Sequence, residues 1–522
     1  MKQPEEIELD LILTPKDASD ENTIRKIAST RLGINLNDIV ELRTIRKSID
    51  ARSAKPKINL KIKVYTHQAP AFSYTPPQYK NAIKGKEVII VGFGPAGLFA
   101  ALELLQHGFR PIILERGKDV SERKKDIALI NRNNAMNINS NYCFGEGGAG
   151  TFSDGKLYSR SKKRGNLQRI FELFHYHGAA DNILYEAHPH IGSDKLPAII
   201  RNMRETICRY GGEVHFNCLV DKLLIENGQI KGCHTSCGKV FYASNVILAI
   251  GHSAHDTYRM LHDQGIRLET KGFAMGVRAE HPQALIDSIQ YHSKTRDPYL
   301  PAASYSLVTQ VKERGVYSFC MCPGGHIVPA GSDNKGLVVN GMSASHRNSP
   351  FANSGIVVEI HPEDIPAPFN EYGELSGLYF QEYLEELCKQ QNHDQSLKAP
   401  AQRLKDFVNG TSSKDLPPCS YLPGIVPSDL HKWLPPIIRY RLQEGFKDFD
   451  KKMKGYVCNE AVIVGVESRS SSPIRIPRDA ETYEHIEIKG LYPCGEGAGY
   501  AGGITSSAMD GINAAEKIVA NA

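Results

Sequence analysis

The chain has 522 residues, of which 41% are hydrophobic and 23% are charged, with a formal net charge of +5. This composition is typical of a globular protein with several domains, and it excludes a disordered, collagen-like or small disulfide-rich protein. Glycine is the one excess, at 45 residues.

The beginning of the chain and its cysteines predict a cytoplasmic protein. The start MKQPEEIELD is acidic and polar, unlike a secretory signal. The 11 cysteines lack the spacing of a disulfide framework. Zinc would need ligands beyond the CxC at 320–322 or the CxxxC at 233–237, so we expect no metal site. The apolar stretch Val88–Leu105 is long enough for a membrane span but contains three glycines, a proline and a glutamate, so we expect no membrane segment.

The first 80 residues predict a small α+β domain that ends in a proline-containing linker. Their hydrophobic periods predict, in chain order, strand Ile7–Leu13, helix Asn22–Leu32 and strands near Ile39–Ile45 and Lys57–Tyr65. Residues 41–85 carry a net charge of +8, which is compatible with a surface for nucleic acid. In KINLKIKV, however, lysines alternate with apolar residues, which favours a strand with one solvent-facing side.

The first glycine cluster has the pattern of a dinucleotide-binding turn. Gly92, Gly94 and Gly97 follow the apolar strand Glu87–Val91 and open a helix with one apolar face. In such a turn the first glycine permits the sharp bend, the second lets a pyrophosphate approach, and the third lets helix and strand pack closely. The helix start would then hold the phosphates. A second strand ends at Glu115, where an acidic side chain typically binds ribose hydroxyls.

The second glycine cluster, FGEGGAGTFSDGK, spans residues 144–156 and also contains a literal GxGxxG at Gly145, Gly147 and Gly150. No apolar strand precedes it and no amphipathic helix follows it, so it is not a second dinucleotide-binding turn. Its bare backbone would let a planar or anionic group come close. A surface loop without a ligand is the alternative interpretation.

The third glycine cluster, GEGAGYAGG, spans residues 495–503. It follows the predicted strand Gly490–Pro493 and opens a predicted C-terminal helix, Thr505–Val519. The start of a helix stabilises negative charge on a ligand there. The apolar segment Val246–Gly251 is a further strand that ends in glycine, where a dinucleotide-binding fold returns its chain beneath the cofactor.

Between the clusters the prediction is coarser. Residues 211–251 predict short strands with turns at Gly211–Gly212, Asn227–Gly228 and Gly238. Residues 271–456 predict strands mixed with helices near 376–391 and 429–453.

Several long motifs together resemble a bacterial family of FAD-dependent oxidoreductases described as NAD(FAD)-utilising dehydrogenases. The motifs are GFGPAG, EGGAGTFSDGKL, ILAIGHSAHD, FAMGVRAEHPQ, YSFCMCPGG, NGMS, ESRSSSPIRIPRD and YPCGEGAGYAGGI. The resemblance spans nearly the whole chain, and it implies FAD bound in an extended form. Glu496 departs from the wider superfamily, in which many members carry aspartate at this position.

Carried over by position, the resemblance implies two groups of cofactor contacts. The pyrophosphate and adenosine would lie against Gly92, Phe93, Gly94, Pro95, Ala96, Gly97, Glu115, Arg116 and Val220. The flavin and ribityl chain would lie against Gly147, Gly148, Ala149, Gly150, Gly251, Glu496, Gly503, Ile504 and Thr505.

The substrate side is less defined, and the sequence assigns no catalytic residue. Polar residues close to the cofactor motifs are Lys156, His252, His255, Arg278, His326, Arg469, Arg475 and Arg478. The arginines of ESRSSSPIRIPRD suit a carboxylate or phosphate of an anionic substrate, and surface or inter-domain salt bridges are the alternative. Cys143 is a candidate redox thiol, although no second cysteine lies close to it in the sequence.

These patterns predict an α/β protein with a Rossmann-like FAD-binding domain of the two-dinucleotide-binding type. We expect an N-terminal domain at 1–80, a split FAD-binding domain at 81–270 and 457–522, and an inserted α+β substrate domain at 271–456. The expected function is hydride transfer through flavin to or from a small organic substrate. Only one dinucleotide-binding fingerprint is present, so a nicotinamide donor, NADH or NADPH, would have to bind transiently near the flavin, or another electron donor serves. An RNA-modifying flavoprotein and an NAD-only dehydrogenase are the alternatives, and the latter leaves the third cluster unexplained. The oligomeric state is not assigned.

Overall fold

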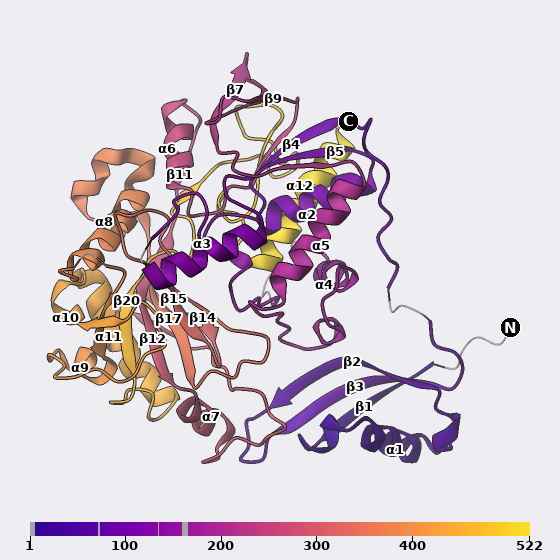
Figure 1. Cartoon of the computed structure of the whole chain (residues 1–522). Coiled ribbons are helices and arrows are strands. Elements are labelled where there is room, and N and C mark those ends of the chain that lie inside the picture. Colours follow the sequence, from indigo (N-terminus) through magenta and orange to yellow (C-terminus); the bar gives the residue numbers. More distant parts are fainter. Residues whose placement is uncertain (1–5, 71–73, 134, 159–164, 395) are drawn as a thin grey trace.

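The computed structural model describes residues 6–70, 74–133, 135–158, 165–394 and 396–522. Figure 1 shows a small β-rich unit at the lower right, an α/β unit at the top and a larger sheet with helices at the lower left. The chain passes from the small unit to the α/β unit, then through the larger sheet, and finally returns to the α/β unit.

The N-terminal unit is a three-stranded antiparallel sheet, in the order β1-β3-β2, with one helix. Its elements are β1 (Glu6–Leu13), α1 (Glu21–Leu32), β2 (Glu41–Asp50) and β3 (Lys57–Tyr65), with single turns of 3-10 helix at Asp17–Ser19 and Leu36–Asp38. Alternate residues of β3, Ile58, Leu60, Ile62 and Val64, are buried. The predicted order of elements is confirmed, and β2 runs five residues further than predicted.

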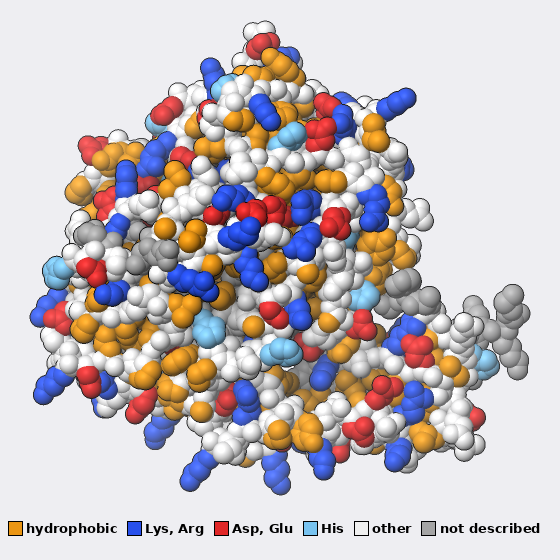
Figure 2. All heavy atoms as spheres, viewed as in Figure 1, with side chains coloured by type: hydrophobic (Ala, Val, Ile, Leu, Met, Phe, Trp, Pro, Cys, Tyr) orange, Lys and Arg blue, Asp and Glu red, His pale blue; other side chains and the backbone are white. Residues whose placement is uncertain are grey.

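Carboxylates pair with much of the basic stretch in this unit. Lys61 and Lys63 of β3 form ion pairs with Glu8 and Glu6 of β1, and Arg43 pairs with Glu41. In Figure 2 basic and acidic side chains are mixed over the visible face of the molecule, the N-terminal unit included. These pairs support the interpretation of a charged strand surface.

A five-stranded parallel sheet, in the order β22-β10-β4-β5-β6, is the centre of the α/β unit. Its strands are β4 (Glu87–Val91), β5 (Arg110–Leu114), β6 (Glu213–His215), β10 (Val246–Leu248) and β22 (Leu491–Pro493). Its helices are α2 (Pro95–Gln106), α3 (Val120–Asn133), α4 (Leu167–Tyr176), α5 (Leu196–Arg209) and α12 (Ile504–Ala520). Helices α2 and α12 pack side by side, although they lie at opposite ends of the chain (Figure 1). This architecture confirms the predicted Rossmann-like fold.

The two faces of the parallel sheet belong to different hydrophobic cores, because successive side chains of each strand point to opposite faces. Ile90 and Ile247 belong to the core shared with α2, α5 and α12. Their neighbours Ile89 and Leu248 belong to a second core with an antiparallel meander and helix α6. These elements are β7 (Val220–Glu226), β8 (Gln229–Thr235), β9 (Val240–Tyr242) and α6 (His255–Asp263). The turns expected at Asn227–Gly228 and Gly238 join the strands of the meander.

The inserted unit is a seven-stranded sheet in the order β13-β14-β17-β12-β20-β18-β19. Its strands are β12 (Phe273–Pro282), β13 (Val308–Val311), β14 (Arg314–Cys322), β17 (Phe351–Ile360), β18 (Ala399–Arg403), β19 (Ile425–Pro427) and β20 (Val462–Glu467). Its helices are α7 (Gln283–Tyr291), α8 (Ser376–Gln390), α9 (Leu404–Asn409), α10 (Leu430–Trp433) and α11 (Pro436–Lys452). A small ribbon, β15 (His326–Pro329) with β16 (Val339–Met342), completes it. A second ribbon, β11 (Glu269–Thr270) with β21 (Ile474–Arg475), lies where the chain enters and leaves the unit.

Two details of this unit differ from the sequence-based expectation. The helix expected near 429–453 is two helices, because Pro435 and Pro436 follow the end of α10 and permit a new helix only from that point. The expected boundary at residue 457 precedes β20, whereas β20 pairs with β12 and β18 of the inserted sheet. By strand pairing, the return to the α/β unit therefore comes after Glu467.

Among the residues that the structure describes, no helix is both long and apolar enough to cross a membrane. The same residues contain no group of three or more histidine, cysteine, aspartate or glutamate side chains placed to hold a metal ion.

Candidate functional site

The turn after β4 requires glycine at two positions. Gly92 has φ +99°, and a Cβ there would lie 2.4 Å from the carbonyl oxygen of Ala249, just after β10. A Cβ on Gly97 would lie 2.1 Å from the carbonyl oxygen of Gly92. Gly94 caps α2 without a side-chain hydrogen bond, so the first amides of this helix are left for a ligand.

Glu115 joins the first glycine cluster to the second. Its Oε2 accepts a hydrogen bond from the amide of Phe93 at 2.9 Å. Its Oε1 accepts hydrogen bonds from the amides of Gly117 and Gly145 at 2.8 and 3.0 Å. The side chain is 4% exposed. This connecting role was not foreseen from the sequence, and the contact with ribose hydroxyls stays a prediction.

Arg116 and Val220, two other predicted adenosine contacts, are also held by the protein. The Arg116 guanidinium forms a two-fold ion pair with Asp256, with both N–O distances 2.8 Å, and lies 4.1 Å from the ring of Phe144. Val220 is buried in the core beneath the meander. Its backbone, rather than its side chain, is therefore the part that could meet an adenine.

The second glycine cluster lies against both of the others. The amide of Gly147 donates to the carbonyl of Phe93 at 2.8 Å. A Cβ on Gly148 would lie 2.9 Å from the Cα of Gly94, and one on Gly150 would lie 3.1 Å from the side chain of Ile504. Ala149 is exposed at the tip. The cluster is thus packed between the starts of α2 and α12, which does not support the interpretation as a free surface loop.

The third glycine cluster packs against the first cluster and against Gly251. A Cβ on Gly495 would lie 2.9 Å from the side chain of Ala96, and one on Gly497 would lie 2.6 to 2.8 Å from the backbone of Gly251. Gly503 caps α12 with no side-chain hydrogen bond, and the Thr505 hydroxyl donates to the carbonyl of Leu157 at 2.7 Å.

The three clusters meet at the starts of α2 and α12, and we call this glycine-lined place the cofactor cleft. Close contacts fill the space behind Gly92, Gly97, Gly148 and Gly497, whereas Gly251, Gly502 and Gly503 have nothing within 4 Å on the side where a Cβ would stand. Two helices of 12 and 17 residues, α2 and α12, begin at the cleft with uncapped amides. Such amides and the helix dipoles favour a phosphate at one end and an electron-rich ring at the other.

Three arginines among the candidate polar residues are used in buried ion pairs. Arg278 pairs with Glu467 at 2.7 Å, Arg469 with Glu385 at 2.7 Å and Arg478 with Asp510 at 2.6 Å. All six side chains are at most 6% exposed. The structural alternative is therefore confirmed for these three. Arg475 differs, because its Nε has no hydrogen-bond partner among the described residues.

The other candidate residues have different surroundings. His252 Nδ1 lies 3.5 Å from Glu496 Oε2. The Cys143 thiol donates to the carbonyl of Ala330 at 3.2 Å, so it contacts the inserted unit. His326 begins β15 and is exposed, while burial of its surroundings lowers its pKa.

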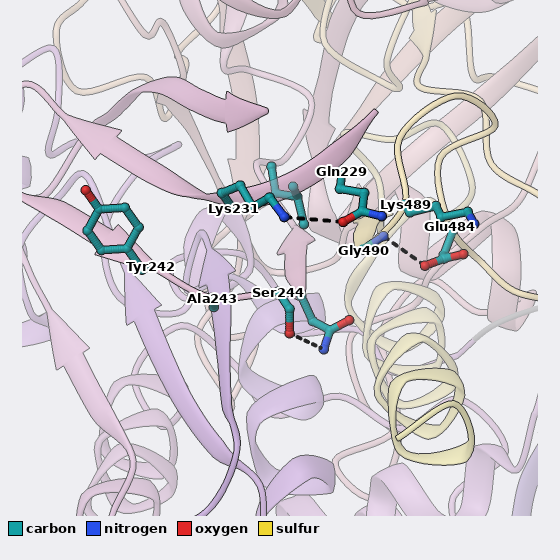
Figure 3. Close-up of a pocket in the computed structure, with 10 residues that line it drawn as sticks. Gln229, Lys231, Tyr242, Ala243, Ser244, Glu484, Lys489 and Gly490 are labelled. Atoms are coloured by element: carbon teal, nitrogen blue, oxygen red, sulfur yellow. Dashed lines mark hydrogen bonds between the residues drawn. The ribbon is translucent and has the colours of Figure 1, made fainter. Parts of the chain in front are cut away.

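A separate pocket, drawn in Figure 3, lies away from the glycine clusters, at the amino ends of strands of the parallel sheet. It has a volume of about 460 Å³ and lies beside the first residues of β10 and β22. Lys231 donates to Gln229 within it, and Glu484 accepts from the amide of Gly490. Because ligands of open parallel sheets bind at the carboxyl ends of the strands, this pocket is not the cofactor cleft.

His255 and Arg259 of α6 hold Glu382 of α8, and this contact predicts a pH dependence. Burial raises the Glu382 pKa, but hydrogen bonds from His255 at 2.9 Å and from Arg259 lower it overall to about 2. A carboxyl group whose pKa is lower in the folded than in the unfolded chain stabilises the folded state when the pH is above the unfolded pKa. This stabilisation is lost as the pH falls from about 4.5 to about 2. We expect the contact to contribute about 2 kcal/mol to the free energy of unfolding at pH 7, after allowance for the partial exposure of the group.

Glu382→Gln should remove this part of the pH dependence, as measured by urea unfolding at pH 7 and at intervals below pH 5. Glu386→Gln, on the same helix, is the control and should leave it unchanged. If the free energy of unfolding varied with pH in the same way for wild type and Glu382→Gln below pH 5, the contact would contribute nothing to the pH dependence of stability.

Comparison with known proteins agrees with this geometry. A family model described as an FAD binding domain matches residues 86–139, and one described as the C-terminal domain of an FAD-dependent protein matches residues 272–470. A domain of unknown function matches residues 5–65. An uncharacterized protein of Clostridium beijerinckii is 41% identical over 520 residues, and the match covers 96% of each chain.

Solved structures also resemble the chain at low identity. The L-proline dehydrogenase from P. horikoshii is 12% identical with a TM-score of 0.36, and the match covers 84% of this chain and 94% of that one. A geranylgeranyl bacteriochlorophyll reductase-like protein from Thermoplasma acidophilum is 13% identical with a TM-score of 0.35, covering 84% and 79%. None of these relatives bears the description of an NAD(FAD)-utilising dehydrogenase, so that part of the resemblance stays a prediction.

Proposed function

Because this chain belongs to the same family as the Clostridium beijerinckii protein and contains an FAD-binding domain, we propose that it is an FAD-dependent oxidoreductase acting on a small organic substrate. The observation that carries the proposal is the convergence of three glycine clusters, distant in the sequence, on one cleft between the starts of α2 and α12. FAD, when bound there, would supply the acceptance or donation of a hydride.

Different segments of the chain would bind different parts of this cofactor. The amides at the start of α2, beside Gly94, would bind the pyrophosphate, and those of Gly503 and Ile504 would face the pyrimidine end of the flavin. The second cluster would cover the middle of the cofactor and exclude water there. The inserted unit contacts the segment just before the second cluster, through Ala330 and Cys143, and would supply the substrate contacts.

The first test is the identity of the cofactor and its reductant. Purified full-length protein should show flavin absorbance, and the released cofactor should have the mass of FAD. Anaerobic titration with NADH, and separately with NADPH, should bleach the flavin if a nicotinamide is the electron donor. A colourless protein that gains no FAD on reconstitution would contradict the proposal, and a released cofactor with the mass of NAD would favour the NAD-only alternative.

A further inference from the structure

Two cysteines of the meander lie on neighbouring backbone segments that run in opposite directions. Cys218 lies just before β7, and Cys237 lies in the turn between β8 and β9. Both are free thiols in this structure. The proposed function uses neither of them, so their arrangement calls for an explanation of its own.

The register of the meander brings these two residues opposite each other. Val220 of β7 pairs with Thr235 of β8 in the antiparallel ladder. One residue further out, the amide of Ser236 donates to the carbonyl of Leu219 at 2.9 Å. The next opposed positions on the two segments are therefore those of the two cysteines. Directly opposed residues of an antiparallel pair have Cα atoms about 4.5–5.5 Å apart, which lies within the span of about 4.4–6.8 Å that a disulfide bridges.

The two side chains also lie on the same side of the meander. Successive side chains of a strand point to opposite faces, so residues two apart share a face. Val220 and Thr235 are buried, and Cys218 is buried in the same core as Val220. Cys237 follows Thr235 by two residues, and its Sγ lies 3.3 Å from the Thr235 hydroxyl oxygen. The thiols of Cys218 and Cys237 are therefore placed to meet.

The two thiols differ in exposure and in acidity. Cys237 is exposed, and hydrogen bonds from the Thr235 hydroxyl and from the backbone amide of Lys239 lower its pKa. Cys218 is 3% exposed, burial raises its pKa to about 11, and the adjacent Cys237 thiol adds to this rise. Because oxidation begins at the thiol that is more ionised and more accessible, Cys237 is the one that an oxidant meets first.

We propose that Cys218 and Cys237 form a reversible oxidation site, at which a hydroperoxide oxidises Cys237 and Cys218 then closes a disulfide. In the first step the Cys237 thiolate takes one oxygen atom from hydrogen peroxide and hydroxide leaves, so that the sulfur becomes a sulfenic acid. In the second step the Cys218 sulfur bonds to the Cys237 sulfur and the oxygen leaves as water. Two thiols and one hydrogen peroxide thus give one disulfide and two water molecules. A thiol reductant reverses the reaction.

The site lies beside a residue of the cofactor cleft. The amide of Cys218 donates to the carbonyl of Glu115 at 2.9 Å, and Glu115 joins the first two glycine clusters. The disulfide would tie the turn between β8 and β9 covalently to the segment that runs beside Glu115. We expect this link to stabilise the meander against local unfolding, because a cross-link restricts the unfolded segment. The inference does not depend on which cofactor the cleft binds.

The test treats the full-length protein with a small excess of hydrogen peroxide, blocks the remaining thiols with N-ethylmaleimide and identifies the tryptic peptides by mass spectrometry. Wild type should yield peptide 210–222 linked to peptide 232–239, and dithiothreitol should separate the two. Because peptide 232–239 also contains Cys233, the variant Cys233→Ala should give the same linked pair. Cys218→Ala should instead accumulate a sulfenic acid at Cys237, which dimedone traps. Cys237→Ala should lose both the link and the trapped product.

Cys208→Ala is the matched control, since Cys208 is also exposed but burial raises its pKa. It should form the link as wild type does. Absence of the link in wild type, or a link that persists in Cys237→Ala through Cys233, would overturn the pairing. Dimedone labelling of Cys208 in preference to Cys237 would overturn the order of attack. Thermal unfolding of each variant before oxidation separates loss of the link from loss of the fold.

Discussion

Substituting alanine for Gly94 should lower the affinity for FAD at least about a hundredfold, equivalent to about 2.7 kcal/mol, while the protein stays folded. The residue has φ −77°, a conformation open to any L-amino acid. A Cβ there would meet no protein atom closer than the Cα of Gly148, at 3.8 Å. The added methyl group would instead occupy the space that a pyrophosphate needs in order to reach the amides of α2.

Measurement of FAD content and thermal unfolding on the same preparation separates binding from folding. Gly94→Ala should match the apoprotein of the wild type in unfolding temperature and yet retain little FAD. Gly97→Ala is the contrasting variant, because its Cβ would lie 2.1 Å from the Gly92 carbonyl oxygen and should destabilise the fold itself. Gly315→Ala, on β14 and with room for a methyl group, should change neither quantity. Normal FAD content in Gly94→Ala would show that the phosphates lie elsewhere.

Replacing Arg278 with methionine should lower the free energy of unfolding of the inserted unit by about 3–5 kcal/mol. The guanidinium is fully buried and donates to Glu467 at 2.7 Å, to Asn353 at 2.9 Å and to the carbonyl of Cys320 at 2.7 Å. Its loss leaves the Glu467 carboxylate buried without its counter-charge. Burial already raises the Glu467 pKa, so the carboxyl group should then take up a proton.

The chain contains one tryptophan, Trp433 in α10, so its fluorescence during urea unfolding reports on the inserted unit. The double variant Arg278→Met with Glu467→Leu should lose less stability than the sum of the two single variants, because removal of both charges leaves neither unpaired. Arg52→Met, which breaks an ion pair on an exposed arginine, should leave the unfolding curve unchanged. Full additivity of the two single changes would show that the pair is not coupled.

Local patterns predicted the parts of the cleft well. The strand Glu87–Val91 has the predicted bounds, and α12 begins one residue before its predicted start. The glycines are informative because a positive φ or a close backbone approach is a local demand that few other residues meet. The contact between the second cluster and Gly94 could be suspected from composition, but its geometry could not be predicted.

Long-range pairs could not be read from the sequence. Nothing near Arg278 in the chain shows that Glu467 neutralises it, since the two residues meet only when β12 and β20 pair. Pairing within the fold, rather than residue type, decides which cations are free.

One edge strand of the parallel sheet, β22, follows the inserted unit in the sequence. This order affects how the protein folds during synthesis. Strand β10 pairs with β22 at residues 246–248 and 491–493, and α12 follows after the third glycine cluster. During synthesis the whole inserted unit leaves the ribosome before this pairing is possible, and such distant contacts form slowly. The cofactor cleft would therefore be completed only after the inserted unit has been synthesised. A nascent or C-terminally truncated chain would expose the unpaired edge of β10 and the apolar side of α2 to chaperones and proteases.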